Sequence, residues 1–189
     1  MRPPKIDDAE LLDRLTEVFR THGYEGASLS RISEATGLRR ASLYHRFPGG
    51  KDEMARAVLE HVDERIAGRA LAALRRSGDP AARVRAMAKE LDAFYSHGRK
   101  SCILDTLSVG DPQKDLRRHI GRSMAAWLKA LATVARDGGA TPAVARRRAE
   151  EALVRIEGGL VLARGLEDPG PFARVLQTLP ELLAPGGDS

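Results

Sequence analysis

The 189-residue sequence has a single cysteine, Cys102, and few aromatic side chains, which make up 4% of the chain. One thiol cannot form an internal disulfide, and no CxxC pair or Cys/His cluster offers the ligands of a structural zinc site. We therefore expect no metal and no cofactor, and a reducing cytosol is the natural setting. A redox switch beside Arg99 and Lys100 and a buried, inert thiol are both open for Cys102, and the inert thiol is the simpler reading.

Long apolar runs are also missing. No stretch approaches the roughly 20 apolar residues that span a bilayer, so no membrane partner is expected. The N-terminus runs directly into charged residues and has no apolar segment of the kind found in signal peptides. Together with the cysteine count, this predicts a cytoplasmic protein.

Alternating apolar and polar residues, the pattern of a half-buried strand, do not occur, and helix signals take their place. Four pairs put a capping side chain before a proline that suits the first helical turn. These pairs are Asp79-Pro80, Asp111-Pro112, Thr141-Pro142 and Asp168-Pro169. Each is followed by apolar residues at steps of three and four, which predicts four long helices with one buried face each.

Shorter helices are expected before residue 50. Asp7 caps a first helix that ends at Gly23, Ser28 caps a second that ends at Gly37, and a third covers about 40–47. A long fourth helix opens at Lys51, and its apolar residues are Met54, Val58, Val62 and Ile66. We expect an all-α fold of about nine helices, with a three-helix domain at 1–50 and a helical bundle at 51–185.

Residues 28–47 have the spacing of a helix-turn-helix, in which the second helix enters the major groove of DNA. Leu43 and Phe47 are four residues apart and are expected to face the core. The side chains left around the exposed side would then be Arg40, Ser42, Tyr44 and His45.

The charge distribution favours the same segment. The formal net charge of the chain is +5. Residues 28–51 contain five cations and the single acid Glu34; the cations are Arg31, Arg39, Arg40, Arg46 and Lys51. Positive charge at this place suits DNA phosphates, although a solvated charged face on an ordinary helical hairpin is the alternative.

The segment also resembles a known family. Residues 23–38 (GYEGASLSRISEATGL), 41–47 (ASLYHRF) and 51–54 (KDEM) are similar to the DNA-binding domain of TetR-family transcriptional regulators. The resemblance implies an all-α homodimer with an N-terminal DNA-reading domain and a C-terminal domain that binds a small effector and dimerises. It implies phosphate contacts at Ser28, Tyr44, His45 and Lys51, and base-reading positions at Arg39, Arg40 and Ser42.

Three positions depart from the family pattern. Arg39 stands where Ser or Thr often caps the recognition helix, and Ala41 stands where Gly is common. The loop Pro48-Gly49-Gly50 is one residue longer than usual. It resembles a subgroup with a Phe-Pro-Gly-Gly-Lys turn, some members of which sense drugs or flavonoids.

The C-terminal half resembles the same subgroup more loosely, at residues 101–107 and 157–164. This suggests a dimer interface on the last two helices, about 142–166 and 169–184, with packing inside one chain as the alternative. The predicted interface residues are Ile156, Gly159, Leu160, Ala163, Phe172, Leu176 and Leu179. The predicted effector-pocket walls, whose alternative is ordinary core, are Phe94, Tyr95, Leu104, Leu107, Met124, Trp127 and Leu131.

These observations together predict a ligand-responsive, sequence-specific DNA-binding regulator. It would be a repressor that a small hydrophobic or aromatic effector releases from a palindromic operator. Its partners would be double-stranded DNA, the effector and a second copy of itself. The alternatives are a helical interaction module and a small helical enzyme without DNA binding, but the sequence shows no convergent set of acid, base, nucleophile or metal ligands.

Overall fold

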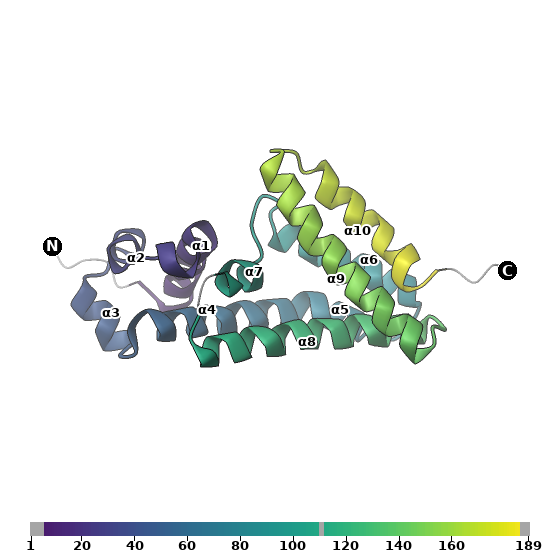
Figure 1. The fold of residues 1–189 in the computed structure, drawn as a ribbon, viewed down its shortest axis with the longest axis horizontal. Helices are drawn as coiled ribbons and strands as arrows, with labels where there is room; N and C mark the ends of the chain where they lie inside the picture. Colours follow the sequence, from purple (N-terminus) through teal and green to yellow (C-terminus); the bar gives the residue numbers. More distant parts are fainter. Residues whose placement is uncertain (1–5, 110–111, 186–189) are drawn as a thin grey trace. The chain divides into compact units, whose positions relative to one another are not determined.

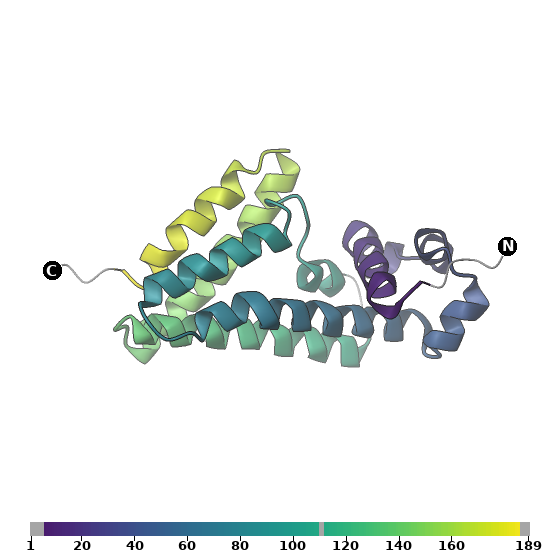
Figure 2. The same cartoon turned by 180° about the vertical axis from the view of Figure 1, so that it is seen from behind.

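The computed structural model describes residues 6–109 and 112–185, and every regular element in these ranges is helical (Figures 1 and 2). The expected all-α class is therefore confirmed. The chain divides into two compact units, one of residues up to 63 plus 103–121 and one of residues 64–102 plus 122 onward. The division cuts two long helices, and each unit is described by itself.

The first unit contains the short N-terminal helices. Its elements are α1 (Asp8–Gly26), α2 (Leu29–Thr36), α3 (Arg40–Arg46), α4 (Gly50–Ile66) as far as Asp63, α7 (Ile103–Ser108) and α8 (Lys114–Asp137) as far as Gly121. Within this unit α1 packs against α2 and α7. Leu15, Phe19, Ile32, Leu43 and Met54 are fully buried and form its apolar centre.

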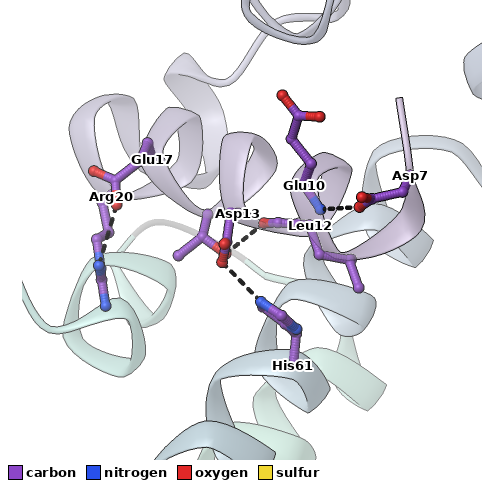
Figure 3. A network of polar contacts seen from close by, with 8 residues as sticks. Asp7, Glu10, Leu12, Asp13, Glu17, Arg20 and His61 are labelled. Carbon is purple, nitrogen blue, oxygen red and sulfur yellow. Dashed lines mark hydrogen bonds and ion pairs between the residues drawn. The ribbon is translucent and has the colours of Figure 1, made fainter. Parts of the chain in front are cut away.

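The helix ends of this unit follow from their capping residues. The Asp7 carboxylate accepts a hydrogen bond from the Glu10 N–H at 2.7 Å (Figure 3). The Ser28 hydroxyl accepts from the Arg31 N–H, and Gly37 ends α2 in the left-handed conformation. These predicted caps are confirmed.

Helix α1 differs from the prediction at its C-terminal end. It bends at Gly23, where φ is 65° and ψ is −177°, and continues to Gly26 instead of stopping. Glycine reaches this conformation without the steric cost that a Cβ would add, so the residue acts as a kink. The turn after the kink holds Tyr24, which is buried.

The second unit is built from longer helices. It contains the end of α4, the π-helical turn η1 (Ala67–Leu71), α5 (Ala72–Leu74), α6 (Pro80–Phe94), the rest of α8, α9 (Pro142–Gly165) and α10 (Gly170–Leu183). Here α10 packs along both α9 and α6, as both ribbon views show. Because α4, η1 and α5 form one continuous stretch, the described residues hold nine helical segments, as expected.

The proline signals mark helix starts in this unit. The Asp79 carboxylate accepts hydrogen bonds from the Ala81 and Ala82 N–H groups, and the Thr141 hydroxyl accepts from the Val144 N–H. The Asp168 carboxylate accepts from the Gly170 N–H at 2.8 Å. Asp111 lies outside the described residues. Among the residues that the structure describes, no helix is long and apolar enough to cross a membrane.

Candidate nucleic-acid interface

The helices α2 and α3 are connected by hydrogen bonds in their turn and by contacts in the core. The Ser33 hydroxyl donates to the Leu38 carbonyl, and the Leu38 N–H donates to the Thr36 hydroxyl at 3.3 Å. Ile32 of α2 and Leu43 of α3 are fully buried. With Leu43 anchored in the core, the opposite side of α3 is left to solvent.

The exposed surface of α3 carries the polar residues predicted from the sequence. Arg39, Arg40, Ser42, Tyr44 and His45 are all exposed. Exposure of the polar set with burial of Leu43 is the arrangement expected of a recognition helix. Phe47, predicted to face the core, is only half-buried. The helix α3 ends at Arg46, and Phe47 is its C-cap residue, with a non-helical backbone conformation.

The arginines around α3 differ in what they contact. Arg40 donates to the Ser30 hydroxyl of α2 at 2.8 Å, which holds its guanidinium beside the exposed face. Arg46 pairs with the Asp8 carboxylate at 2.9 Å and donates to the Ile6 carbonyl. Arg46 therefore ties α3 to the start of α1, whereas Arg39 makes no side-chain cap on α3, as its departure from Ser/Thr predicted.

Ser28 is exposed at the N-terminus of α2. Its oxygen accepts the Arg31 N–H at 3.3 Å. A hydroxyl that accepts in a cap still has its own proton to donate. The cap and a phosphate contact are therefore compatible at this residue.

Lys51 is presented by two residues that sequence reasoning missed. Its Nζ lies 4.2 Å from the centroid of the Tyr24 ring, which is a cation–π distance. The Tyr24 hydroxyl in turn donates to the Asp52 carboxylate. Burial above all, and then the hydrogen bond to Asp52 and its charge, raise the pKa of Tyr24, so this hydroxyl stays protonated as a donor. The signal in the sequence was the Gly23-Tyr24 pair within the TetR-like run of residues 23–38.

The backbone conformation of the loop Pro48-Gly49-Gly50 favours a glycine at position 50. Gly50 has φ +65°, and a Cβ built on it would lie 3.4 Å from Cε1 of Tyr44. Its N–H donates to the Phe47 carbonyl at 2.9 Å, and the Gly49 N–H donates to the Glu53 carboxylate at 2.7 Å. The loop therefore closes a turn between α3 and α4 and satisfies one donor at the start of α4.

The seven residues predicted for a dimer interface are buried within one chain. A Cβ on Gly159 would lie 3.1 Å from Cγ2 of Val175 and 3.4 Å from Cα of Phe172, so this glycine lets α10 approach α9. Ala163 Cβ likewise lies 3.0 Å from the position that a Cβ on Gly98 would take. Because Ile156, Leu160, Phe172, Leu176 and Leu179 are also covered by their own chain, these side chains offer little surface to a partner.

The predicted effector-pocket walls fall into both units. Leu104 and Leu107 are buried in the first unit. Tyr95, Trp127 and Leu131 are buried in the second, where Phe94 and Met124 are half-buried. The Phe94 and Tyr95 rings meet edge to face at 5.0 Å, and Tyr95 meets Phe172 at 6.0 Å. Tyr95 therefore belongs to an aromatic contact between α6 and α10.

The described residues also bear on two other kinds of site, a reactive thiol and a metal site. Cys102 is buried. Within residues 6–109 and 112–185 no group of three or more His, Cys, Asp or Glu side chains is placed to hold a metal ion.

Comparison with known proteins agrees with this geometry. The family model described as "Bacterial regulatory proteins, tetR family" matches residues 11–58. The model described as "Transcriptional regulator LmrA/YxaF-like, C-terminal domain" matches residues 80–178. The HTH-type transcriptional regulator LmrA of Bacillus subtilis is 26% identical over 181 residues, which cover 92% of this chain and 95% of LmrA.

Two solved structures share the fold. A TetR transcriptional regulator from Legionella pneumophila superposes with a TM-score of 0.83 at 18% identity, over 97% of this chain and all of that one. The TetR-family regulator CifR, solved as a cysteine mutant with 26-base-pair operator DNA, gives a TM-score of 0.75 at 23% identity, over 94% of this chain and 98% of CifR. With one family model spanning the helix-turn-helix and another spanning more than half of the sequence, the chain belongs to the TetR family of transcriptional regulators and is not an enzyme.

Proposed function

We propose that the chain is a ligand-responsive repressor that binds a specific DNA sequence through α3 and leaves it when a small effector binds. In this proposal residues 1–50 read DNA, and residues 51–185 bind the effector and dimerise. The observation that carries it is the surface of α3: five polar residues are exposed on and next to this helix, while its Leu43 is fully buried. CifR, which shares the fold, was solved on operator DNA, and this supports the proposal.

The proposed contacts divide by chemistry. Arg39, Arg40 and Ser42 lie at the N-terminal end of α3, which reaches base edges in a helix-turn-helix. An arginine can bind guanine with two parallel hydrogen bonds, so Arg40 is the strongest candidate for sequence reading. Its contact with Ser30 supports this role, because a guanidinium held in place loses less side-chain freedom on binding.

Phosphate contacts would flank the base-reading residues. Ser28 is exposed at the N-terminus of α2, Tyr44 and His45 are exposed on α3, and Lys51 stands in the first turn of α4. The unpaired N–H groups of a helix N-terminus favour an anion, so Lys51 and the start of α4 would act on the same phosphate. Such contacts add affinity without sequence preference.

A homodimer is proposed from the exposed side of α9. Val154, Val161, Leu162 and Leu166 are 53–71% exposed, although they are large and apolar. Gly158, on the same helix, has open space where a Cβ would be. Positions 154, 158, 161, 162 and 166 recur at steps of three and four, so they form one stripe. A continuous exposed apolar stripe of this kind is typical of an interaction surface, and a second copy with the same stripe would cover it.

A two-fold dimer would carry two copies of α3, and these require two half-sites in inverted order. The operator is therefore expected to be palindromic. Repression follows if the dimer occupies a promoter, and release follows if the effector binds the DNA-incompetent form more tightly. For the effector we retain the predicted small hydrophobic or aromatic class, with the aromatic contact of Phe94 and Tyr95 as its supporting feature.

The test is selection of bound sequences from random DNA, followed by gel-shift titration of variants against the selected site and a scrambled one. Arg40→Ala should bring the affinities for the two DNAs together. Tyr44→Ala and Lys51→Ala should weaken both by similar factors, and Lys51→Ala should lower the slope of log affinity against log salt by about one. Arg76→Ala, an exposed arginine of the second unit, is the matched control.

Two results would contradict the proposal. Selection that yields no sequence motif would support a helical interaction module instead. If Arg40→Ala, Tyr44→Ala and Lys51→Ala each bound DNA with wild-type affinity, α3 would not be part of the DNA interface.

A further inference from the structure

We propose that a cavity of the second unit, between the end of α4 and α6, is an effector site for a small organic anion with an apolar body, such as an aromatic or short-chain carboxylate. The cavity has a volume of about 230 Å³. It lies below the roughly 300–1,000 Å³ of sites that take drug-sized ligands, which points to a small molecule. The inference rests on the proposed function in that it names the class of the effector.

The lining of this cavity has an excess of positive charge. Arg65 and Arg69 come from the end of α4 and from η1, and Lys100 comes from the segment after α6. Glu90 of α6 is the one carboxylate among the described lining residues. The excess of two formal positive charges favours an anion, and two arginines allow bidentate binding of a carboxylate.

The deeper lining is apolar. Ile66 and Ala70 come from the α4–η1 stretch, and Leu91 comes from α6; all three are buried. Phe94 adds a half-buried aromatic ring and is the member of the predicted effector set that lines this cavity. A ligand that fits both features has a charged end near the arginines and a hydrophobic end against these side chains.

Two irregular backbone segments border the same cavity. Arg69 and Ala70 belong to the π-helical turn η1, a feature that is frequent at functional sites. Ser96, also in the lining, has φ 50°, and the following His97 has φ 59°. Consecutive non-glycine residues in the left-handed region store strain, which the surrounding structure must support. Three of the lining residues, Arg69, Ala70 and Ser96, therefore come from backbone that departs from regular α-helix.

A second cavity in the same unit shows the contrast. It lies between α6 and α10 and has a volume of about 560 Å³. Its charged residues balance, with Arg85 and Lys89 against Asp92 and Glu181. Because its charges balance, this larger cavity has no electrostatic preference for an anion. The smaller cavity, with its excess of positive charge, is therefore the better candidate.

The continuity of α4 offers a route from this site to DNA binding. The helix begins with Lys51 in its first turn and reaches the cavity with Arg65 and Ile66 in its last. A carboxylate that binds the DNA-incompetent form more tightly would shift the population toward it. The ligand would then release DNA without touching α3.

The experiment is calorimetric titration of the full chain, without DNA, with benzoate and hexanoate and with their uncharged amides, benzamide and hexanamide. We expect at least one acid to bind and its amide to bind at least about tenfold more weakly. Arg69→Gln with Lys100→Gln should weaken the acid by about tenfold or more, and Arg76→Gln should leave it unchanged. Ala93→Leu, at an exposed position of the rim, should block both acid and amide by filling space.

Each other result has a defined meaning. Absence of binding by both acids, equal binding of acid and amide, or unchanged binding in the double variant and in Ala93→Leu would overturn the site. Thermal unfolding of each variant shows whether it is folded, and Arg69→Gln alone, at an exposed side chain, is the milder substitute if the double variant unfolds. Specific DNA binding without carboxylate binding would contradict only the effector site. Carboxylate binding without DNA binding would contradict the proposed DNA-binding function.

Discussion

Nε2 of His61 lies 2.9 Å from Oδ1 of Asp13 and joins α4 to α1 (Figure 3). The His61 side chain is 16% exposed, so its ring is largely removed from water. A second pair, His119 with Asp63 at 2.9 Å, joins α8 to α4 in the same unit. Both pairs connect helices far apart in the sequence, and both depend on α4.

Replacement of His61 by Ala should destabilise the first unit. The loss should be about 0.5–1.5 kcal/mol, at the low end because Asp13 is half exposed and water can replace part of the contact. Urea unfolding followed by far-UV circular dichroism measures the change. His22→Ala is the matched control, because His22 is an exposed histidine of α1. Equal unfolding midpoints for the two variants would show that the pair adds nothing to stability.

The ring of Tyr24 should contribute to DNA affinity, and its hydroxyl should contribute to stability. Tyr24→Phe keeps the ring beneath Lys51 and should leave DNA affinity within about twofold of wild type, while Tyr24→Leu removes the ring and should weaken it more. Loss of the hydrogen bond to Asp52 should cost Tyr24→Phe about 1 kcal/mol of stability. Gel-shift titration and urea unfolding measure the two quantities.

The pH dependence of this stability difference has a definite sign. Because the pKa of Tyr24 is raised in the folded state, its contribution is fully present below about pH 10, the ordinary tyrosine value. It should be lost as the pH rises from there through the folded-state pKa. The gap between wild type and Tyr24→Phe should therefore be constant near neutrality and shrink in alkali. A gap that widens in alkali would contradict the burial and the Asp52 contact as causes.

Local signals in the sequence located most of the helices and the exposed polar residues of α3. Caps such as Asp7 and Ser28 act within four residues, and the apolar steps fix which side of each helix is buried. The kink at Gly23 escaped prediction because a glycine permits both a stop and a bend. Contacts with distant residues decide between the two, and here α1 packs on α7 beyond residue 100.

Long-range pairings were the part that the sequence did not reveal. Tyr24 and Asp52 meet across 28 positions, and neither residue type by itself indicates the other. On α9, apolar residues occur on more than one side of the helix. Periodicity alone could not show that Leu160 is buried within its own chain while Val161 is exposed.

Gly50→Ala should destabilise the turn between α3 and α4. Its φ of +65° costs a residue with a Cβ about 1–2 kcal/mol, and the new Cβ would lie 3.4 Å from the Tyr44 ring. Thermal unfolding measures the loss, and DNA affinity should also fall because Tyr44 is a proposed phosphate contact. Gly121→Ala is the matched control: it lies inside α8 in open space and should stabilise by roughly 0.5–1 kcal/mol. If the two substitutions shift the melting temperature in the same direction, the left-handed conformation at Gly50 is not required.

Val161→Glu should disrupt self-association if the exposed stripe of α9 forms the dimer. A carboxylate introduced near the centre of an apolar, two-fold interface meets its own copy and loses water, so a loss of about 1–3 kcal/mol, or roughly 10- to 100-fold in dimer affinity, is expected. Analytical ultracentrifugation over a concentration series measures the dimer affinity.

Val109→Glu is the matched control. Val109 is also apolar and exposed, but it lies in the segment after α7 and not on α9. A Val161→Glu protein that stays dimeric at the concentration where wild type does would place the interface elsewhere. If it becomes monomeric and keeps its helical circular dichroism, loss of cooperative binding to a palindromic site should accompany the change, because each half-site would then be bound alone.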